Sequence, residues 1–282
     1  MNVKFREFMP RDYPFLVNIH NLSDTVWPVS QKSMLYEDKH RIHPERFKRV
    51  VACKKTQHSE EILGYGEYKF HPGVTPYKPD ELDISIFVHP AYRRKGIGSA
   101  LLKYLENEAK TRFDIKTFTS AAISNEGINF LKKHGFREVF CEEIGFLKLD
   151  EYVPKLTSCR EWLKNNKVTI VSLNEVQAEN KFIKMYELHT KILMDLEGHP
   201  PVTIFTYEEF LTYYINSPDA TIDSYFLAKH GNNYVGECLL RREPADPVPY
   251  INIIGVLPEF KFIELIIALL YETVEYARSK NY

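Results

Sequence analysis

One loop of the sequence combines glycine with cationic side chains in a pattern suited to binding an anion. The segment after Val88 contains, in order, His, Pro, Ala, Tyr, Arg93, Arg94, Lys95, Gly96, Ile97, Gly98 and Ser99, and an apolar helical pattern follows it. A loop that opens a helix presents unpaired N–H groups and the positive end of the helix dipole. Glycine lets the backbone approach a phosphate closely, and Arg and Lys add positive charge. The loop therefore predicts a diphosphate site.

The spacing within this loop separates three kinds of phosphate site. No GxxxxGK[ST] is present, which argues against nucleotide hydrolysis at a P-loop. The dinucleotide pattern GxGxxG begins at Gly96 and Gly98, but its third glycine is replaced by Leu101, and the loop follows antiparallel strands instead of opening a βαβ unit. NAD binding is thus the weaker alternative. Residues 93–98 match the remaining pattern, [Q/R]xxGx[G/A], in full.

Two carboxylates precede the loop and are candidates for a general base. In the strand-like run at residues 81–88, two-residue alternation places Glu81, Asp83 and Ser85 on one face and Ile86 on the other. A carboxylate can take a proton from a neighbouring group, directly or through water. Two solvated charges at the start of a strand fit the pattern equally well, and both interpretations stay open.

The elements that position these residues are predicted in the order β α α β β β α β α β over residues 1 to about 150. Alternation and turn residues indicate strands near 3–8, 47–55, 61–70, 81–88 and 117–123, and FREVFCEEIGFLKL (136–149) reads as a final strand or hairpin. The order begins again at Val168, at a spacing of roughly 165 residues. We expect an α/β fold of the α+β type with two domains, 1–150 and 168–282, joined by a helix at 151–167.

Two signatures in the first half resemble those of the GCN5-related N-acetyltransferase (GNAT) family. The first is the lead-in VxPxxR at residues 88–93 together with the glycine loop, and the second is Asn125 followed by a short helix that ends at Gly135-Phe136. The resemblance implies tandem GNAT-like domains, each with a mixed, mostly antiparallel sheet flanked by helices. It also implies that the loop binds the pyrophosphate of acetyl-CoA.

The same resemblance assigns cofactor contacts to the strand before the loop. The pantetheine arm would add between the fourth and fifth strands and pair with main-chain groups of Ile86, Phe87 and Val88. An N–H near Val88 would polarise the thioester carbonyl, and Asn125 would bind near the pantetheine. The implied reaction is transfer of an acetyl group from acetyl-CoA to an amine of a small molecule or protein, by direct attack.

One departure from the family pattern leaves a second function open. Many members carry a Tyr that protonates the leaving thiolate, but the corresponding residue here is Leu131. A non-catalytic module that binds or senses acyl-CoA is therefore the alternative. His134, just before Gly135, reads as a cation at a helix C-terminus.

The second half aligns with the first but lacks its loop chemistry. Glu264 and Ile266 stand where Gly96 and Gly98 stand in the first half, so a carboxylate would repel a pyrophosphate and a branched side chain would block the backbone. The last strands of this copy are also missing before Tyr282. We expect a degenerate, incomplete copy whose open sheet edge needs covering, for example by a second chain in a homo-oligomer.

Composition narrows the range of partners. The 282 residues include 37 Lys plus Arg and 38 Asp plus Glu, so no net positive field favours nucleic acid. The four cysteines are widely spaced, and the histidines at 40, 43, 58 and 71 lack metal-ligand spacing, so we expect reduced thiols and no metal. No apolar leader or membrane-spanning run is evident, which predicts a cytoplasmic protein without a membrane partner.

The resemblance implies that the acceptor binds to helices and loops that vary within the family. Residues 25–44 and 71–80 are the candidates, and the first contains Trp27, Tyr36, Glu37, Asp38, His40 and His43. Aromatic faces and carboxylates suit a cationic amine of modest size, held in a cleft between the two halves. An ordinary amphipathic helix with solvated charges fits the same segment.

Overall fold

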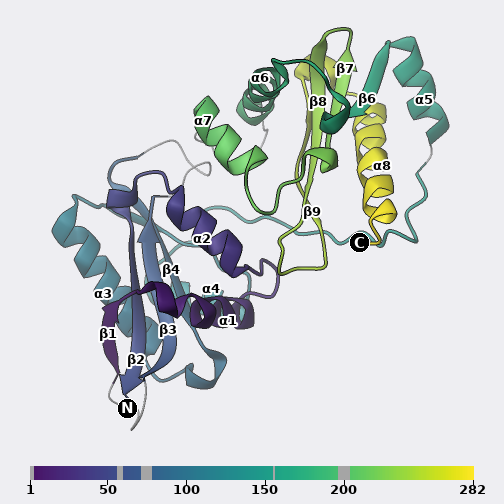
Figure 1. Cartoon of the computed structure of the whole chain (residues 1–282). Helices are drawn as coiled ribbons and strands as arrows, with labels where there is room; N and C mark the ends of the chain where they lie inside the picture. The colour runs from purple at the N-terminus through teal and green to yellow at the C-terminus, as the bar shows by residue number, and fades with distance from the viewer. Residues whose placement is uncertain (1–2, 56–59, 71–77, 155, 196–203) are drawn as a thin grey trace. The chain divides into compact units, whose positions relative to one another are not determined.

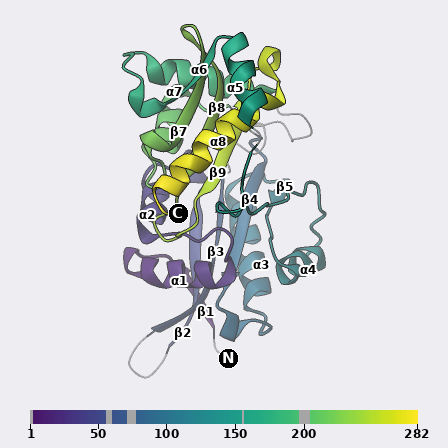
Figure 2. The same cartoon turned by 90° about the vertical axis from the view of Figure 1, so that its right-hand side faces the viewer.

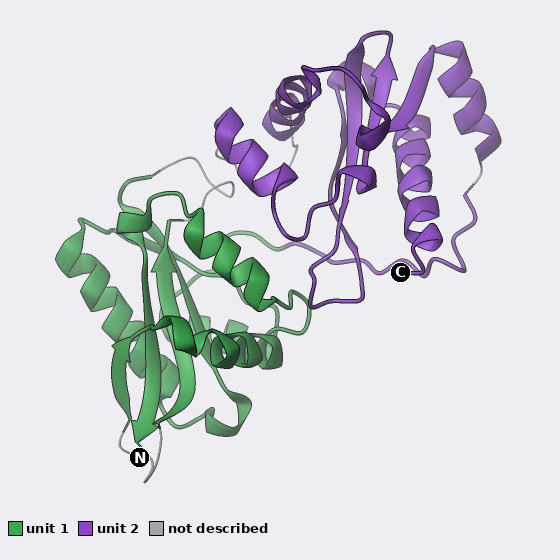
Figure 3. Cartoon of the chain, viewed as in Figure 1, with its two compact units in different colours: residues 1–141 green, residues 142–282 purple. Residues whose placement is uncertain are grey.

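The computed structural model describes residues 3–55, 60–70, 78–154, 156–195 and 204–282. The chain divides into two compact units, residues 1–141 and 142–282 (Figure 3). Each unit has one β-sheet with helices on both of its faces (Figure 1). No helix among the described residues has the length and apolar character that crossing a membrane requires.

The first unit has a five-stranded sheet in the order β1-β2-β3-β4-β5. All neighbours are antiparallel except β4 and β5, which are parallel. Its elements are β1 (Lys4–Glu7), α1 (Tyr13–Ser23), α2 (Gln31–Lys39), β2 (Lys48–Lys55), β3 (Glu60–Lys69), β4 (Glu81–Val88), α3 (Ile97–Arg112), β5 (Thr117–Thr119) and α4 (Asn125–Lys133).

Alternation along the central strands supplies an apolar surface to both faces of this sheet. On one face, Leu82 and Ile84 of β4 pack with the buried stripe of α3, whose members include Leu101 and Leu105. On the other face, Tyr65 of β3 packs under α1 and α2 in a separate core cluster. The helical period of α3 and the two-residue period of β4 therefore place the loop between them at one end of the sheet.

The strand predicted at 117–123 ends at Thr119, and the strand or hairpin predicted at 136–149 is wrong. Residues 136–148 form neither helix nor strand, and Val139 and Phe146 are 91% and 81% exposed. An alternating pattern becomes a strand only when a neighbour offers backbone partners. Strand β5 offers only three residues, which leaves these apolar side chains without a sheet to join.

The second unit has a four-stranded antiparallel sheet in the order β6-β7-β8-β9. Helix α8 lies across this sheet, and α5, from the segment predicted to connect the domains, packs against α8 (Figure 2). The elements are α5 (Leu156–Asn165), β6 (Val168–Ser172), α6 (Lys181–Met194), α7 (Tyr207–Phe210) with a π-helical turn at Leu211–Ile215, β7 (Tyr225–His230), β8 (Asn233–Arg241), β9 (Tyr250–Val256) and α8 (Ile263–Ser279).

The strand register identifies equivalent positions in the two units. Gly64 faces Val88 in the first unit, and Gly236 faces Val256 in the second. A Cβ on Gly64 would lie 2.6 Å from the carbonyl oxygen of Phe87, and one on Gly236 would lie 3.2 Å from that of Gly255. The same close approach of two strands therefore recurs, as expected for two copies of one fold.

The helix after this point starts differently in the two units. With Val88 and Val256 aligned, α8 begins two residues earlier than α3 does. The counterparts of Lys95 and Gly96, which are Ile263 and Glu264, thus belong to the first turn of a helix instead of to a loop. The second unit has lost the shape of the loop as well as its glycines.

Candidate active site

The glycine loop has the backbone shape of an anion site. Gly96 caps α3 with φ of 82°, and Arg94 is also left-handed with φ of 62°. Ala100 N–H donates to the Gly96 carbonyl, which closes the first turn of the helix. The N–H groups of the residues between them point out of the helix end. Apart from the adjoining residues, no atom lies within 4 Å of a Cβ built on Gly96, so the space beside this residue is open.

Two of the cationic side chains that were predicted to bind the ligand, Arg93 and Lys95, also hold the loop in place. Arg93 Nε donates to the carbonyl of Val88 over 3.2 Å, and its Nη1 lies 3.1 Å from Oε2 of Glu126 in α4. Lys95 Nζ donates to the carbonyl of Ala91. Arg93 therefore joins the end of β4 to α4, while Arg94 is exposed beside the helix end.

Gly98 has a packing role in addition to the predicted approach to phosphate. A Cβ there would lie 3.3 Å from Cε2 of Phe130 in α4 and 3.6 Å from Cγ2 of Val88. Glycine therefore lets α4 pack closely against the first turn of α3. Asn125 is the first residue of α4 and is exposed, and Ser99 Oγ lies 2.8 Å from Nε2 of His134 just beyond the helix.

The edge of β4 next to the loop is open on one side. His89 N–H donates to the Leu63 carbonyl, and antiparallel alternation then directs the backbone groups of Phe87 toward β3 and those of Ile86 and Val88 away from it. Strand β5 pairs only with Glu81–Asp83. Within the part of the chain that the structure describes, no strand pairs with this side of Ile86 or Val88, so β4 and β5 diverge as predicted.

The backbone groups of Phe87 face β3 and not the open edge of β4, and its side chain packs on the face of the sheet that α1 covers. The ring stacks on Tyr65 at 4.9 Å between centroids and lies 4.6 Å from the ring of His20 in α1. Tyr65 Oη and His20 Nδ1 are 3.1 Å apart, and burial raises the pKa of Tyr65 well above its ordinary value. These rings form an apolar wall beside β4 on the face of the sheet that α1 covers.

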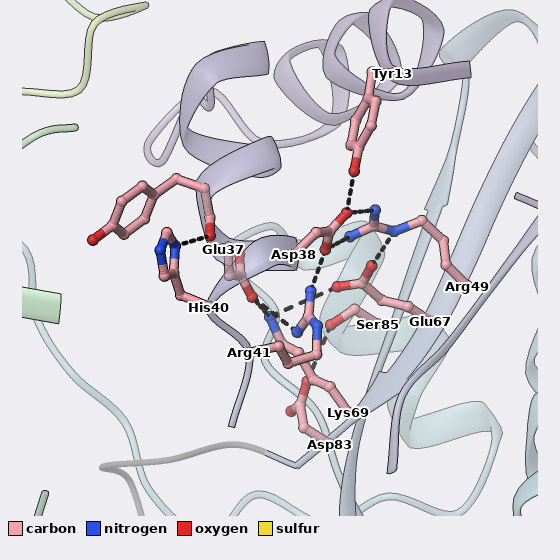
Figure 4. Close-up of polar contacts among 11 residues, drawn as sticks. Tyr13, Glu37, Asp38, His40, Arg41, Arg49, Glu67, Lys69, Asp83 and Ser85 are labelled. Atoms are coloured by element: carbon pink, nitrogen blue, oxygen red, sulfur yellow. Dashed lines mark hydrogen bonds and ion pairs between the residues drawn. The ribbon is translucent and has the colours of Figure 1, made fainter. Parts of the chain in front are cut away.

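A network of acids and bases lies further along the same face (Figure 4). We call it the charge cluster; its members come from α2, the turn after it, β2 and β3, and are Glu37, Asp38, Arg41, Arg49, Glu67 and Lys69.

Arg49 is the centre of the cluster. Its Nη1 donates to Oδ2 of Asp38 over 2.5 Å and its Nε donates to Oε2 of Glu67 over 2.6 Å. Its side chain is 3% exposed, and that of Glu67 is 9% exposed. Tyr13 Oη donates to Asp38 over 2.7 Å. One guanidinium group therefore ties α1 and α2 to the middle of the sheet.

Lys69 and Arg41 complete the cluster on its outer side. Lys69 Nζ lies 3.1 Å from Oε1 of Glu37 and 3.7 Å from Oε1 of Glu67. Arg41 pairs with both carboxylates of α2, Glu37 and Asp38. Lys69 has the largest effect on Glu37 and lowers its pKa. Burial alone would raise the pKa of Glu67, but the charges of Arg49 and Lys69 lower it below the ordinary value.

These lowered pKa values predict acid sensitivity of the first unit. A carboxylate with a folded-state pKa below the unfolded-state value stabilises the fold above the unfolded-state pKa, about 4.3 for Glu. That contribution is lost as pH falls through the folded-state pKa of Glu67. The free energy of unfolding, measured against pH, should therefore fall below about pH 4.3, and less steeply in Glu67→Gln. An identical slope in the variant would contradict this.

The two candidate bases lie at the N-terminal end of β4, close to the cluster. Ser85 Oγ donates to Oδ1 of Asp83 over 3.2 Å, and Asp83 is one of the charges that raise the pKa of Lys69 (Figure 4). Glu81 pairs with Lys78 over 3.2 Å, and its side chain is 12% exposed. Both carboxylates belong to the face predicted by alternation, and each has a polar partner.

Four members of the charge cluster were not predicted from the sequence: Arg41, Arg49, Glu67 and Lys69. One signal was available, because Tyr65, Glu67 and Lys69 alternate along residues 62–69, whose other members are Ile, Leu, Gly and Tyr. A carboxylate at the centre of a buried strand requires a partner. Of the second acceptor segment predicted, residues 71–77 lie outside the described part of the chain, as does His58.

Comparisons with known proteins agree on one family. The model for the acetyltransferase (GNAT) family matches residues 13–136. No protein of curated function matches the chain in sequence.

Solved structures with the same fold cover both units. A GCN5-related N-acetyltransferase from Sphaerobacter thermophilus is 18% identical with a TM-score of 0.60, over 98% of this chain and 83% of that one. A tandem GNAT protein from the clavulanic acid biosynthesis pathway is 15% identical with a TM-score of 0.62, over 98% and 86%. A GCN5-related glucosamine N-acetyltransferase region of a fungal multi-domain β-N-acetylglucosaminidase is 11% identical with a TM-score of 0.65, over 99% of this chain and 34% of that one.

The glycine loop and the open edge of β4 thus lie in the region that the family model matches. The repetition of the sheet in the second unit is matched by the tandem GNAT protein, which covers 98% of this chain. Residues 13–136, within the first unit, match the model for the acetyltransferase (GNAT) family, and the two units together have the fold of a tandem GNAT protein.

Proposed function

We propose that this protein is an N-acetyltransferase that moves the acetyl group of acetyl-CoA to an amine of a small molecule or a protein by direct attack. The observation that carries the proposal is the continuity between the open edge of β4 at Ile86 and Val88 and the open N-terminus of α3 at Gly96. Together they offer backbone partners for a pantetheine arm and a positively polarised end for a pyrophosphate.

The residues present fit this cofactor. The space beside Gly96 that a Cβ would fill is open, and the exposed Arg94 adds positive charge near the N-terminus of α3. The N–H and carbonyl of Ile86 and the N–H of Val88 would pair with the pantetheine amides, and Asn125 would contact the cofactor from α4. When bound, acetyl-CoA supplies a thioester whose carbonyl carbon is open to attack by an amine.

The protein's own groups would handle the acceptor and its proton. The charge cluster has four carboxylates around it when Asp83 is included, against the three cations of Arg41, Arg49 and Lys69. This balance favours an ammonium group over an anion. Asp83 or Glu81 would remove the proton from that group, and the Val88 N–H would stabilise charge on the thioester oxygen.

Release of free thiol from acetyl-CoA in the presence of an amine panel tests the proposal. Turnover with at least one amine is expected. Without amine, thiol release should not exceed the rate of acetyl-CoA hydrolysis. If the protein binds acetyl-CoA but turns over no amine, it is a sensing module instead. Leu131, at the position where a thiolate-protonating Tyr is common, is the residue that favours this second function.

Substitution of each candidate base shows which of the two carboxylates, Asp83 or Glu81, removes the proton from the amine. We expect Asp83→Asn to lower kcat/KM for the amine by about 100-fold, because general-base catalysis typically contributes 10²–10⁴-fold. Acetyl-CoA affinity should not change, since the amide keeps the shape of the carboxylate. Asp114→Asn, at a site whose side chain is 93% exposed, is the matched control. Full activity in Asp83→Asn with loss in Glu81→Gln would move the role to Glu81.

A further inference from the structure

A side-chain hydrogen bond joins the two helices that border the pyrophosphate loop. Ser99 Oγ, in the first turn of α3, lies 2.8 Å from Nε2 of His134, which caps the C-terminus of α4. Both residues are partly buried. This contact was not expected from the sequence, where His134 reads as a cation that interacts with its own helix dipole.

The position of the imidazole is fixed by the end of α4. His134 N–H donates to the carbonyl of Leu131, and Gly135 follows in the left-handed conformation with φ of 85°. Phe136 N–H then donates back to the Leu131 carbonyl, which completes the helix end. The ring of Phe130 lies 4.7 Å from that of His134, and Phe130 also packs on Gly98. The imidazole is thus held against the first turn of α3.

The hydroxyl of Ser99 can donate only one proton, so the partner of that proton matters. If Ser99 donated to His134, its remaining lone pairs would face an incoming anion and oppose binding. If Nε2–H of His134 donates to Ser99, the serine proton is free to be donated to a phosphate oxygen beside the exposed N–H groups of the helix. An anion at this helix end therefore favours the second arrangement.

We propose that His134 is a positioning residue for the pyrophosphate of acetyl-CoA: its Nε2–H donates to Ser99 Oγ and directs the serine proton toward the phosphate. This inference rests on the proposed function, in which the loop at Gly96 binds that group. His134 does not touch the acetyl group or the amine, so its effect is on cofactor affinity and not on the chemical step.

Calorimetry with acetyl-CoA on the full chain tests the proposal in wild type, His134→Leu, Ser99→Ala and the double variant. Each single variant is expected to raise Kd about tenfold, as for a lost hydrogen bond to a charged group. The double variant should bind no more weakly than either single one, because both remove the same proton donor. His134→Gln, whose amide N–H can take the place of Nε2–H, should restore most of the affinity.

A cofactor fragment without the pyrophosphate distinguishes this role from loss of packing. With S-acetylpantetheine as acetyl donor in the thiol-release assay, His134→Leu should have the kcat/KM of wild type. The same substitution at His230, in the second unit, is the matched control for both assays.

Three results would overturn the proposal: unchanged affinity in His134→Leu and Ser99→Ala, additive losses in the double variant, or an equal loss with S-acetylpantetheine. If His134→Leu does not fold, Ser99→Ala alone still decides, because unchanged affinity there removes the phosphate donor from the argument. Wild-type protein that fails to bind acetyl-CoA would overturn the proposed function and this inference with it, whereas wild-type binding with indifferent variants would overturn only the inference.

Discussion

Replacing Gly96 with glutamate is expected to abolish acetyl-CoA binding. The φ of 82° at this position disfavours any side chain, and a glutamate here would add a carboxylate to the loop that is assigned to the pyrophosphate. A carboxylate there would repel the phosphates and occupy their place at the helix end. Calorimetry should show Kd raised by at least about 100-fold, the result of losing several charge-assisted hydrogen bonds at about tenfold each.

A matched glycine separates this effect from backbone strain. Gly231, in the turn between β7 and β8, also has a positive φ, of 60°, and nothing within 4 Å of its Cβ position. Gly231→Glu therefore carries similar strain without a role at the loop, and it should bind acetyl-CoA as the wild type does. If Gly96→Glu kept wild-type affinity, the pyrophosphate would not lie at this loop.

Replacing Arg49 with methionine is expected to destabilise the first unit by about 3–5 kcal/mol, the range found when one partner of a buried ion pair is removed. Asp38 and Glu67 would lose their shared partner inside the sheet, where little water can reach them. Denaturant unfolding in a Trp162→Phe background, followed by the fluorescence of Trp27, reports on the first unit because the chain has two tryptophans. The transition should shift to lower denaturant concentration.

Two further variants show whether burial causes the loss. Lys116→Met removes an ion pair with Asp80 whose lysine side chain is 68% exposed, and it should change stability by no more than about 0.5 kcal/mol. Adding Asp38→Asn and Glu67→Gln to Arg49→Met should recover part of the stability, since no unpaired charge then remains buried. A small effect of Arg49→Met, similar to that of Lys116→Met, would contradict the central role of this residue.

Local patterns were sufficient for the elements that bear the site. The period of α3, the alternation in β4 and the turn at Gly96 predicted the strand, loop and helix in their observed order, and Gly135 ended α4 as expected. Each of these signals depends on residues close together in the chain. The family resemblance then supplied a role for the loop that spacing alone could not choose.

Long-range partners account for what the sequence did not provide. Whether residues 136–149 form a strand depends on a neighbour, and the short β5 is set by contacts far from it in sequence. Arg49 and Glu67 are 18 residues apart, and Ser99 and His134 are 35 apart, so no periodicity relates them. Pairings of this kind follow only from the register of strands and the packing of helices.

The early start of α8 bears on how the second unit could ever regain a function. Glu264→Gly would restore one glycine, but the residue would still belong to the first turn of a helix and not to a loop. A side chain can be exchanged in one mutational step, whereas recovering the loop also requires the first residues of α8 to leave the helix. Glu264→Gly alone is therefore not expected to give the second unit a site for a pyrophosphate.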